Sequence, residues 1–235
     1  MTPPALAVHP FPGEQPVLLL HGLHRSTKLD WIDPGWPQSL ADAGRGAVGI
    51  DLPGHGDSPT ADRGTIPPSA IVAAMVDAID TTGQERADVV GYSLGARLAW
   101  TLAATGRVRR LVLGGMDPSR RTDIDIDLLG AVTRGEIEPP DESIGMLAGM
   151  ITSNGVDTVT ALWLIEGLQI EAFDAAADVP TVPTLIVCGT DDGAAALEAL
   201  AAGIPTATFL SVPGDHGGAL MSPEFRAAAI DFITT

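Results

Sequence analysis

The sequence is short of cysteine, of aromatic side chains and of basic residues, and these shortages exclude several classes of protein. Its single cysteine, Cys188, excludes a disulfide within the chain and any redox or metal motif that needs two thiols. With 13 basic against 30 acidic residues the formal charge is −17, which repels the phosphates of nucleic acids and anionic membrane surfaces. We therefore expect no nucleic-acid partner. The same acidic excess also serves solubility without any partner.

The sequence also lacks a long hydrophobic run and a signal peptide. No stretch approaches the roughly 18 apolar residues of a membrane span. The first residues, Met1 to Ala5, carry neither a basic region nor an apolar core. We expect a protein that does not bind membranes and is cytoplasmic. Its 235 residues, 45% of them hydrophobic, suffice for one large domain with a sizeable core.

Short β-rich runs alternate with helical patterns through most of the chain. The runs are apolar without strict alternation, which is typical of strands buried on both faces of a parallel sheet. This pattern predicts an α/β fold with a doubly wound, mostly parallel sheet. The predicted strands are 17–20, 47–50, 87–90, 108–113, 184–188 and 206–212, and the predicted helices are 36–43, 69–81, 94–105, 194–202 and 222–233.

The middle of the chain breaks this alternation. It offers helical patterns at 142–152 and 156–167 but no convincing strand. We therefore predict a helical cap at 118–177, inserted into an α/β core made of 1–117 and 178–235.

Several apolar residues of the predicted cap are placed to line a pocket. We name Met146, Met150 and Trp163 as candidate substrate contacts. Cap helices must also bury an apolar face against the core, and this packing alone would explain the same residues.

Ser93 is the candidate nucleophile, in the segment Gly91-Tyr92-Ser93-Leu94-Gly95. A Gly-x-Ser-x-Gly pattern is weak by itself, but here a strand precedes it and a helix follows it. The glycines suit a serine on a strained turn, because larger neighbours would clash with the adjacent strand and helix. The Leu94 N–H, at the helix N-terminus, points to where charge develops on an attacked carbonyl oxygen. We therefore name it as an oxyanion-hole donor.

A serine nucleophile needs a base, and the base needs an acid that orients it. His216 follows the last predicted strand on a glycine-rich loop and is the candidate base. Asp192 follows the strand at 184–188 and is the candidate acid. Asp191 is an alternative acid, in which case Asp192 only caps the next helix.

The sequence resembles the α/β-hydrolase superfamily over nearly its whole length. The resemblance is carried by the strand end Leu18–Gly22, the turn at 51–58, the Ser93 elbow, the Gly-Asp-His loop, and the chain order Ser, Asp, His. It implies the α/β-hydrolase fold, with the Leu23 N–H as second oxyanion donor. Within this superfamily, haloalkane dehalogenases and epoxide hydrolases use an aspartate as the nucleophile. A serine at position 93 therefore disfavours their reactions. About sixteen residues precede the first strong strand, room for one of the family's usual two N-terminal antiparallel strands.

Two histidines flank the turn that carries Leu23. We expect His21 to be a structural hydrogen-bonding residue and His24 to border the substrate entrance. The pair lacks an accompanying cysteine pair or a helical His-Glu motif, so no metal site is predicted. The proposed chemistry needs no cofactor.

The predicted function is hydrolysis of an ester or similar acyl bond of a small, apolar molecule, through a Ser93, His216 and Asp192 triad and an acyl-enzyme. A carbon–carbon bond hydrolase or a triad-bearing lyase would show the same elbow and is the nearest alternative. A receptor that binds its ligand without turnover is an alternative from another class. The natural substrate and the oligomeric state are left open by the sequence.

Overall fold

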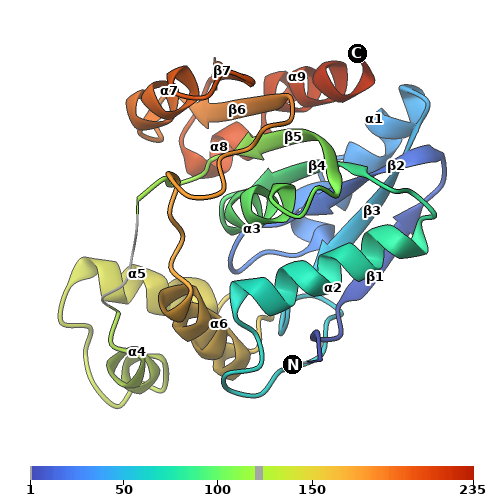
Figure 1. The fold of residues 1–235 in the computed structure, drawn as a ribbon. Helices are drawn as coiled ribbons and strands as arrows, with labels where there is room; N and C mark the ends of the chain where they lie inside the picture. Colours follow the sequence, from blue (N-terminus) through green and yellow to red (C-terminus); the bar gives the residue numbers. More distant parts are fainter. Residues whose placement is uncertain (1, 120–123) are drawn as a thin grey trace.

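The strands form one mostly parallel sheet, as the sequence predicts. The computed structural model describes residues 2–119 and 124–235. In this part of the chain, seven strands pair in the order β1-β3-β2-β4-β5-β6-β7 (Figure 1). Only β1 runs antiparallel to its neighbour, β3. The strands are β1 (Ala7–Phe11), β2 (Glu14–Leu20), β3 (Arg45–Asp51), β4 (Ala87–Tyr92), β5 (Val108–Gly114), β6 (Thr184–Gly189) and β7 (Ala207–Val212).

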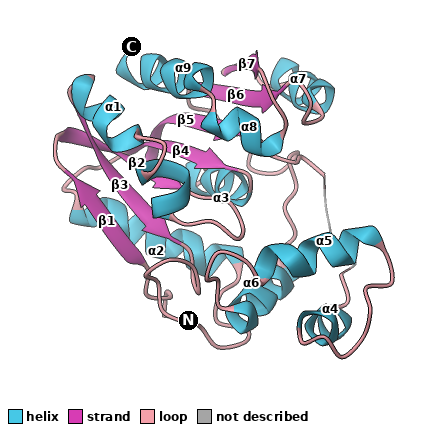
Figure 2. Cartoon of the chain, turned by 180° about the vertical axis from the view of Figure 1, so that it is seen from behind, coloured by secondary structure: helices cyan, strands magenta, loops and turns pink. Residues whose placement is uncertain are grey.

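Helices cover both faces of this sheet (Figure 2). On one face α2, α3 and α7 pack against the strands, and on the other face η1, α1, α8 and α9 do so. The helices are the π-helix η1 (Lys28–Ile32), α1 (Trp36–Asp42), α2 (Pro68–Thr81), α3 (Leu94–Ala103), α4 (Ile126–Thr133), α5 (Glu142–Ile151), α6 (Thr158–Ile170), α7 (Ala194–Ala202), α8 (His216–Met221) and α9 (Pro223–Thr234).

The core lies on both sides of the sheet because successive residues of a strand point to opposite faces. In β2, Leu18 and Leu20 pack toward α2 and α3, whereas Val17 and Leu19 pack toward the other face, where Trp36 lies. Three leucines of α3, spaced four residues apart, are all buried against the sheet: Leu94, Leu98 and Leu102. The α/β architecture therefore follows from the apolar runs of the sequence.

Three short elements were not expected from the sequence. These are η1, α4 and α8. The sequence predicted His216 on a loop, but in the structure this loop ends at Asp215 and His216 is the first residue of α8. The cause is Asp215, whose side chain accepts the Gly218 N–H at 2.8 Å and so caps a new helix. In the same way, Asp125 accepts the Leu128 N–H at 3.0 Å and starts α4.

Helices α4, α5 and α6 follow one another between β5 and β6 and form a group of their own, at the lower left of Figure 1. They fall within the range predicted as a cap, of which positions 120–123 lie outside the described residues. They share an apolar cluster that includes Leu129, Ile151 and Ile165. The Asp157 N–H donates to the Gly54 carbonyl at 2.8 Å and ties α6 to the core. We call α4–α6 the inserted helices.

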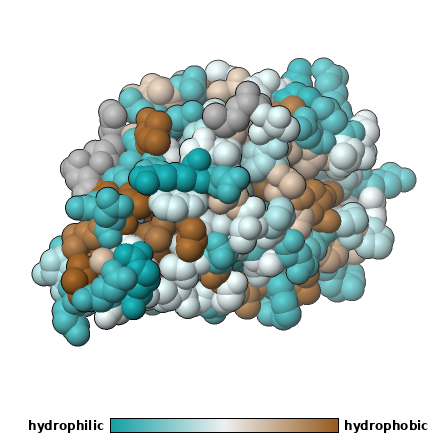
Figure 3. All heavy atoms as spheres, turned by 90° about the horizontal axis from the view of Figure 1, so that it is seen from below, coloured by the Kyte–Doolittle hydropathy of each residue, from teal (hydrophilic) through white to brown (hydrophobic). Residues whose placement is uncertain are grey.

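The inserted helices also carry much of the apolar surface of the molecule. Viewed from below, apolar residues gather at the left of the molecule (Figure 3). Met146 of α5 and Ile170 of α6 are among the most exposed large hydrophobic residues, at 62% and 71%. Among the described residues, no helix combines the length and the apolar character that crossing a membrane requires.

A buried ion network fixes the start of β4, the strand that leads to Ser93. Arg45 of β3 donates to Asp88 Oδ2 at 2.6 Å, and Arg109 of β5 donates to Asp88 Oδ1 at 2.8 Å. Arg45 is itself buried and also donates to the Ile233 carbonyl of α9 at 2.8 Å. The Asp88 carboxylate therefore joins β3, β4 and β5 at the end of the sheet opposite Ser93.

Replacing this carboxylate should destabilise the fold. Asp88→Ala leaves the buried Arg45 guanidinium without a carboxylate to balance its charge, so we expect the free energy of unfolding to fall by about 3–5 kcal/mol. The matched control is Asp80→Ala, because Asp80 pairs with Arg107 at the surface, and such pairs contribute less than about 1 kcal/mol. Urea unfolding followed by circular dichroism measures both losses. Equal losses of unfolding free energy in the two variants would contradict the expectation that the Asp88 network contributes more than the surface pair.

Candidate active site

Ser93 lies where the order of the strands reverses. The chain places β3 on one side of β2 and β4 on the other, and in open α/β sheets ligands bind at this switch point, outside the carboxyl ends of the strands. Leu20 of β2 pairs with Gly91 of β4, so the two segments that follow these strands are neighbours. A Cβ atom added to Gly22 would lie 3.3 Å from the Ser93 Cβ atom. The Gly22 turn and the elbow therefore meet at one point.

Ser93 adopts an unusual backbone conformation, with φ 54° and ψ −115°. This region disfavours residues with a side chain, and such strain concentrates at functional sites. The two glycines of the motif permit the turn. A Cβ on Gly91 would lie 2.4 Å from the Gly95 carbonyl oxygen, and one on Gly95 would lie 2.2 Å from the Leu20 carbonyl oxygen. The elbow is thus packed directly against the end of β2.

The structure brings His216 and Asp192 together. His216 Nδ1 lies 2.8 Å from Asp192 Oδ2. A carboxylate accepts hydrogen bonds, so Nδ1 carries the proton and Nε2 keeps a lone pair that can accept one. Asp191, the alternative acid, has an exposed side chain, and its N–H donates to the Gly214 carbonyl at 3.0 Å. Between these described residues, the geometry selects Asp192 as the partner of His216.

Ser93 Oγ donates no hydrogen bond to His216 in the described structure, although the residue next to it reaches the histidine. The Tyr92 hydroxyl donates to the His216 carbonyl at 2.6 Å, and the two ring centroids are 5.4 Å apart. Burial raises the pKa of the Tyr92 hydroxyl, which keeps it protonated as a donor. Tyr92 therefore anchors the start of α8 beside the elbow. No pattern in the sequence indicated this role, because the contact joins residues 124 positions apart.

Cys188 lies in β6 below the Asp192 loop. Its thiol is buried and donates to the Asp192 carbonyl oxygen at 3.3 Å. Burial raises the pKa of the thiol to about 11, so it remains protonated at neutral pH. Its surroundings are those of a small buried residue of the sheet.

Leu23 and Leu94 hold the two N–H groups named as oxyanion donors. Leu94 is the first residue of α3, and Leu23 follows the Gly22 turn. Neither N–H donates a hydrogen bond to any residue that the structure describes. The Leu23 side chain packs against both the sheet core and the apolar cluster of the inserted helices. Both N–H groups therefore remain available to an acceptor.

His24, a candidate substrate contact, lies beside this turn with a positive φ of 58°. Its Nδ1 atom is buried without a hydrogen-bond partner among the described residues. Burial, with the nearby Arg25 guanidinium, lowers the pKa of His24, so the ring is neutral. Its carbonyl accepts the Asn154 side-chain amide at 3.0 Å, which links the turn to the loop between α5 and α6. Asn154 had no signal in the sequence.

The three candidate contacts on the inserted helices have different surroundings. Met146 points into solvent, as noted above, and Met150 is half-buried. The Trp163 ring lies under the Arg63 guanidinium, 4.8 Å from the ring centroid, and Arg63 in turn forms a two-pronged ion pair with Glu166. Of the three, only Trp163 packs against both the sheet core and the cluster of the inserted helices.

Two buried histidines lie under the site. His21 Nδ1 donates to the Gly22 carbonyl at 2.7 Å, and its Nε2 accepts the Leu52 N–H at 2.9 Å. His55 Nδ1 donates to the Pro53 carbonyl at 2.8 Å, and its Nε2 has no partner among the described residues. Burial lowers the pKa of each ring to about 4. Both rings are therefore neutral and fix the turns that contain them.

One group of side chains has the spacing of a metal site. Ligand atoms of His9, Asp51 and Asp57 lie within 4.8 Å of one another. The Asp51 oxygens already accept the Thr27 N–H at 2.7 Å and the Asp57 N–H at 2.9 Å, and His9 Nε2 lies 2.9 Å away. These contacts explain the buried carboxylate without an ion.

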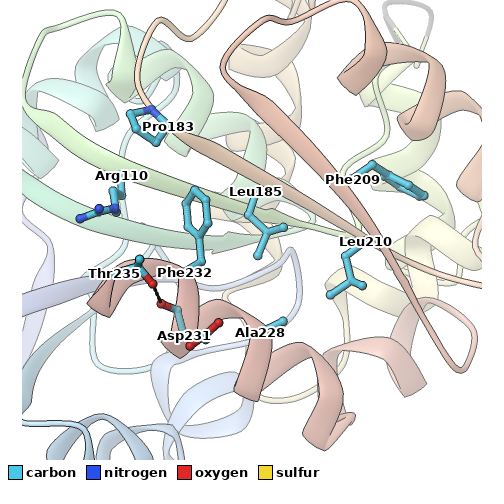
Figure 4. Close-up of a pocket in the computed structure, with 9 residues that line it drawn as sticks. All are labelled: Arg110, Pro183, Leu185, Phe209, Leu210, Ala228, Asp231, Phe232 and Thr235. Atoms are coloured by element: carbon cyan, nitrogen blue, oxygen red, sulfur yellow. Dashed lines mark hydrogen bonds between the residues drawn. The ribbon is translucent and has the colours of Figure 1, made fainter.

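A hollow of about 460 Å³ lies between the last two strands and α9 (Figure 4). Leu185, Leu210 and Phe232 line it, together with Arg110. Arg110 and Leu185 lie near the amino ends of β5 and β6, whereas Ser93, Asp192 and His216 follow carboxyl ends. This hollow therefore contributes nothing to the candidate site.

Comparisons with known proteins agree with the observed fold. A family model described as the alpha/beta hydrolase fold matches residues 15–130. A dihydrolipoyllysine-residue acetyltransferase component of an acetoin cleaving system, from Cupriavidus necator, is 31% identical over 166 residues, 66% of this chain and 42% of that protein. The human putative protein-lysine deacylase ABHD14B is 44% identical over 68 residues, 27% of this chain and 32% of that protein. The chain thus aligns with less than half of each relative.

Solved structures match over almost the whole chain. An esterase from Exiguobacterium antarcticum superposes with a TM-score of 0.76 at 17% identity, covering 98% of this chain and 96% of that one. An enol-lactonase from Burkholderia xenovorans superposes with a TM-score of 0.74 at 20% identity, covering 98% and 96%. Likeness at such low identity establishes the fold.

The neutral histidines under the site should make the fold sensitive to acid. Because the pKa of His21 and His55 falls from 6.5 to about 4 on folding, the unfolded chain binds more protons between these values. The contribution of the neutral histidines to the free energy of unfolding is therefore fully present above the pKa of the unfolded state. It is lost as the pH falls toward the pKa of the folded state. As the pH falls from about 7.5 to about 5, we expect each histidine to lower the free energy of unfolding by about 2 kcal/mol.

The variant His55→Asn tests this expectation, because an amide can donate to Pro53 but does not titrate. In urea unfolding over this pH range, the free energy of unfolding of the variant should fall by about 2 kcal/mol less than that of the original chain. Above about pH 7.5, the difference between the two proteins should not change with pH. An identical loss in both proteins would refute the assignment for His55.

Proposed function

Because the chain belongs to the α/β-hydrolase fold superfamily, we propose that it is a serine hydrolase that cleaves an ester or similar acyl bond of a small, apolar molecule. The observation that carries the proposal is the 2.8 Å contact between His216 Nδ1, at the start of α8, and Asp192 Oδ2, in the loop that follows β6. It orients a base whose Nε2 can accept a proton, and the strained Ser93 directly follows Tyr92, whose hydroxyl donates to the His216 carbonyl.

In the proposed reaction, His216 Nε2 takes the Ser93 hydroxyl proton as Oγ bonds to the carbonyl carbon. The carbonyl electron pair moves onto oxygen, and the Leu23 and Leu94 N–H groups stabilise that charge. When the pair returns, the bond to the leaving alcohol breaks and the imidazolium gives it the proton. Water then attacks the acyl-enzyme by the same steps and releases the acid.

Asp192 stabilises the imidazolium and holds its tautomer throughout the reaction. Side chains of the sheet hold the backbone of His216 and Asp192. The Tyr92 hydroxyl donates to the His216 carbonyl, and the Cys188 thiol donates to the Asp192 carbonyl. The main chain at base and acid is thus anchored by side chains of β4 and β6, which are interior strands of the sheet.

We propose that the inserted helices act as a cap over the acyl group. Leu23 shares an apolar cluster with half-buried residues of these helices, among them Leu147 and Trp163. An acyl chain bound at Ser93 would find apolar side chains on this side, which supports an apolar substrate.

A second candidate is removal of an acyl group from a lysine side chain. The observation that favours it is the 44% identity over 68 residues to a putative protein-lysine deacylase. The same triad would serve, with His216 protonating an amine instead of an alcohol. A panel of p-nitrophenyl esters and acyl-lysine peptides ranks the two candidates by kcat/KM, and the preferred class identifies the substrate.

Ser93→Ala should abolish turnover while leaving the fold intact. We expect kcat on a p-nitrophenyl ester to fall on the order of 10⁴ to 10⁶, because no other group replaces the attacking oxygen. Ser143→Ala is the control, since Ser143 is an exposed serine on α5. Activity that survives in Ser93→Ala would exclude this nucleophile. A chain that binds ligands but never hydrolyses an ester would instead be a receptor.

Asp192→Asn tests the acid in comparison with its neighbour. An amide at this position favours the wrong tautomer of His216, so we expect kcat to fall by about 10⁴. Asp191→Asn should change kcat by less than about threefold, because its side chain does not contact the imidazole. Stopped-flow or steady-state kinetics on the same ester decide the question. The reverse pattern would assign the role to Asp191.

A further inference from the structure

Asp30 is a fully buried carboxylate that the reaction above does not use. It lies in η1, and none of its surface is exposed. Its Oδ2 accepts the Gly22 N–H at 3.0 Å, and its Oδ1 accepts Arg25 Nε at 2.6 Å. Burying a carboxylate is costly unless its oxygens are well paired. Both of its pairing groups belong to the turn that passes Ser93.

The Gly22 residue is consequently held at both ends. Asp30 fixes its N–H, and His21 Nδ1 fixes its carbonyl oxygen at 2.7 Å. In a trans peptide the carbonyl and the following N–H point in opposite directions. The His21 contact to the Gly22 carbonyl therefore sets the direction of the Leu23 N–H, and the Asp30 contact to the Gly22 N–H fixes the peptide that precedes it.

Arg25 compensates the charge that this arrangement introduces. A carboxylate near a developing oxyanion would repel it through a low-dielectric interior. The Arg25 guanidinium pairs with Asp30 and also donates from Nη2 to the Leu29 carbonyl at 3.1 Å, so the turn between 22 and 30 is closed by one ion pair. The pair as a whole is close to neutral toward the site.

We propose that Asp30 is a positioning residue of the oxyanion hole: it holds the His21–Gly22 peptide, and together with the His21 contact to the Gly22 carbonyl it keeps the Leu23 N–H directed toward the substrate oxygen. The inference rests on the proposed function, because it assumes that Ser93 attacks a carbonyl. Arg25 acts with Asp30 as one unit.

The test uses Asp30→Asn in the full chain. An amide offers only one oxygen, so either the Gly22 N–H or Arg25 loses its acceptor. We expect kcat on a p-nitrophenyl ester to fall about ten- to a hundredfold, with KM changed by less than about twofold. The inhibition constant of an aryl trifluoromethyl ketone, whose serine adduct carries the same oxyanion, should rise by the same factor as kcat/KM falls. A merely structural role would not link these two quantities.

Asp33→Asn is the matched control, because Asp33 ends the same helix but pairs with Lys28 at the surface, 2.6 Å away. Both kinetic quantities should stay within about twofold. If Asp30→Asn does not fold by circular dichroism, Arg25→Gln tests the same unit from its more exposed side, with the same loss of kcat expected.

The outcomes separate the inference from the function on which it rests. Turnover by the original chain, with unchanged kcat in a folded Asp30→Asn or in Arg25→Gln, would overturn the role of Asp30 alone. A fall in kcat without a parallel change in ketone binding would overturn it as well. If the original chain neither turns over esters nor binds the ketone, the proposed function fails and the inference with it.

Discussion

The turn between β4 and α3 is the constraint on which the candidate site depends. Ser93 is held at φ 54° because β4 ends against β2 and α3 starts immediately afterward. A Cβ on Gly95 would strike the Leu20 carbonyl, so the helix can approach this strand only with glycine there. This contact sets where α3 begins, and hence where the Leu94 N–H and the serine hydroxyl lie. The buried Asp88 network secures the other end of β4.

The remaining parts of the site are held in place by hydrogen bonds from side chains to main-chain atoms and from main-chain N–H groups to side chains. Tyr92 holds the His216 carbonyl, and Cys188 holds the Asp192 carbonyl. On the opposite side, His21 and Asp30 hold the two ends of Gly22. Fixing loops through their backbones leaves the side chains of the proposed triad free for chemistry, which is how preorganised sites are built.

Sequence patterns predicted the fold and the candidate residues because these depend on local order. Apolar runs gave the strands, and the Gly-x-Ser-x-Gly pattern at a strand–helix junction gave Ser93. Asp192 and His216 came from their positions after two later strands. The structure places them 2.8 Å apart at Nδ1 and Oδ2, and it leaves Asp191 exposed. Their roles in catalysis remain a proposal.

What the sequence could not predict depends on contacts across the fold. Asp30 sits in a π-helix whose sequence has no distinctive period, and its carboxylate matters only because Gly22 lies opposite. The N-cap hydrogen bond that starts α8 is a local contact of Asp215, but the glycines after His216 favoured a loop. Asn154 reaches His24 from 130 residues away along the chain. Such pairs are visible only after the strands are ordered.

The central claim is that Ser93 is a nucleophile activated by its surroundings. The most direct measurement is mass spectrometry of the chain after reaction with a fluorophosphonate, followed by peptide mapping of the adduct. The account predicts one adduct per chain, on the peptide that contains Ser93, formed fastest when His216 is neutral. No adduct, or an adduct on another residue, would contradict it.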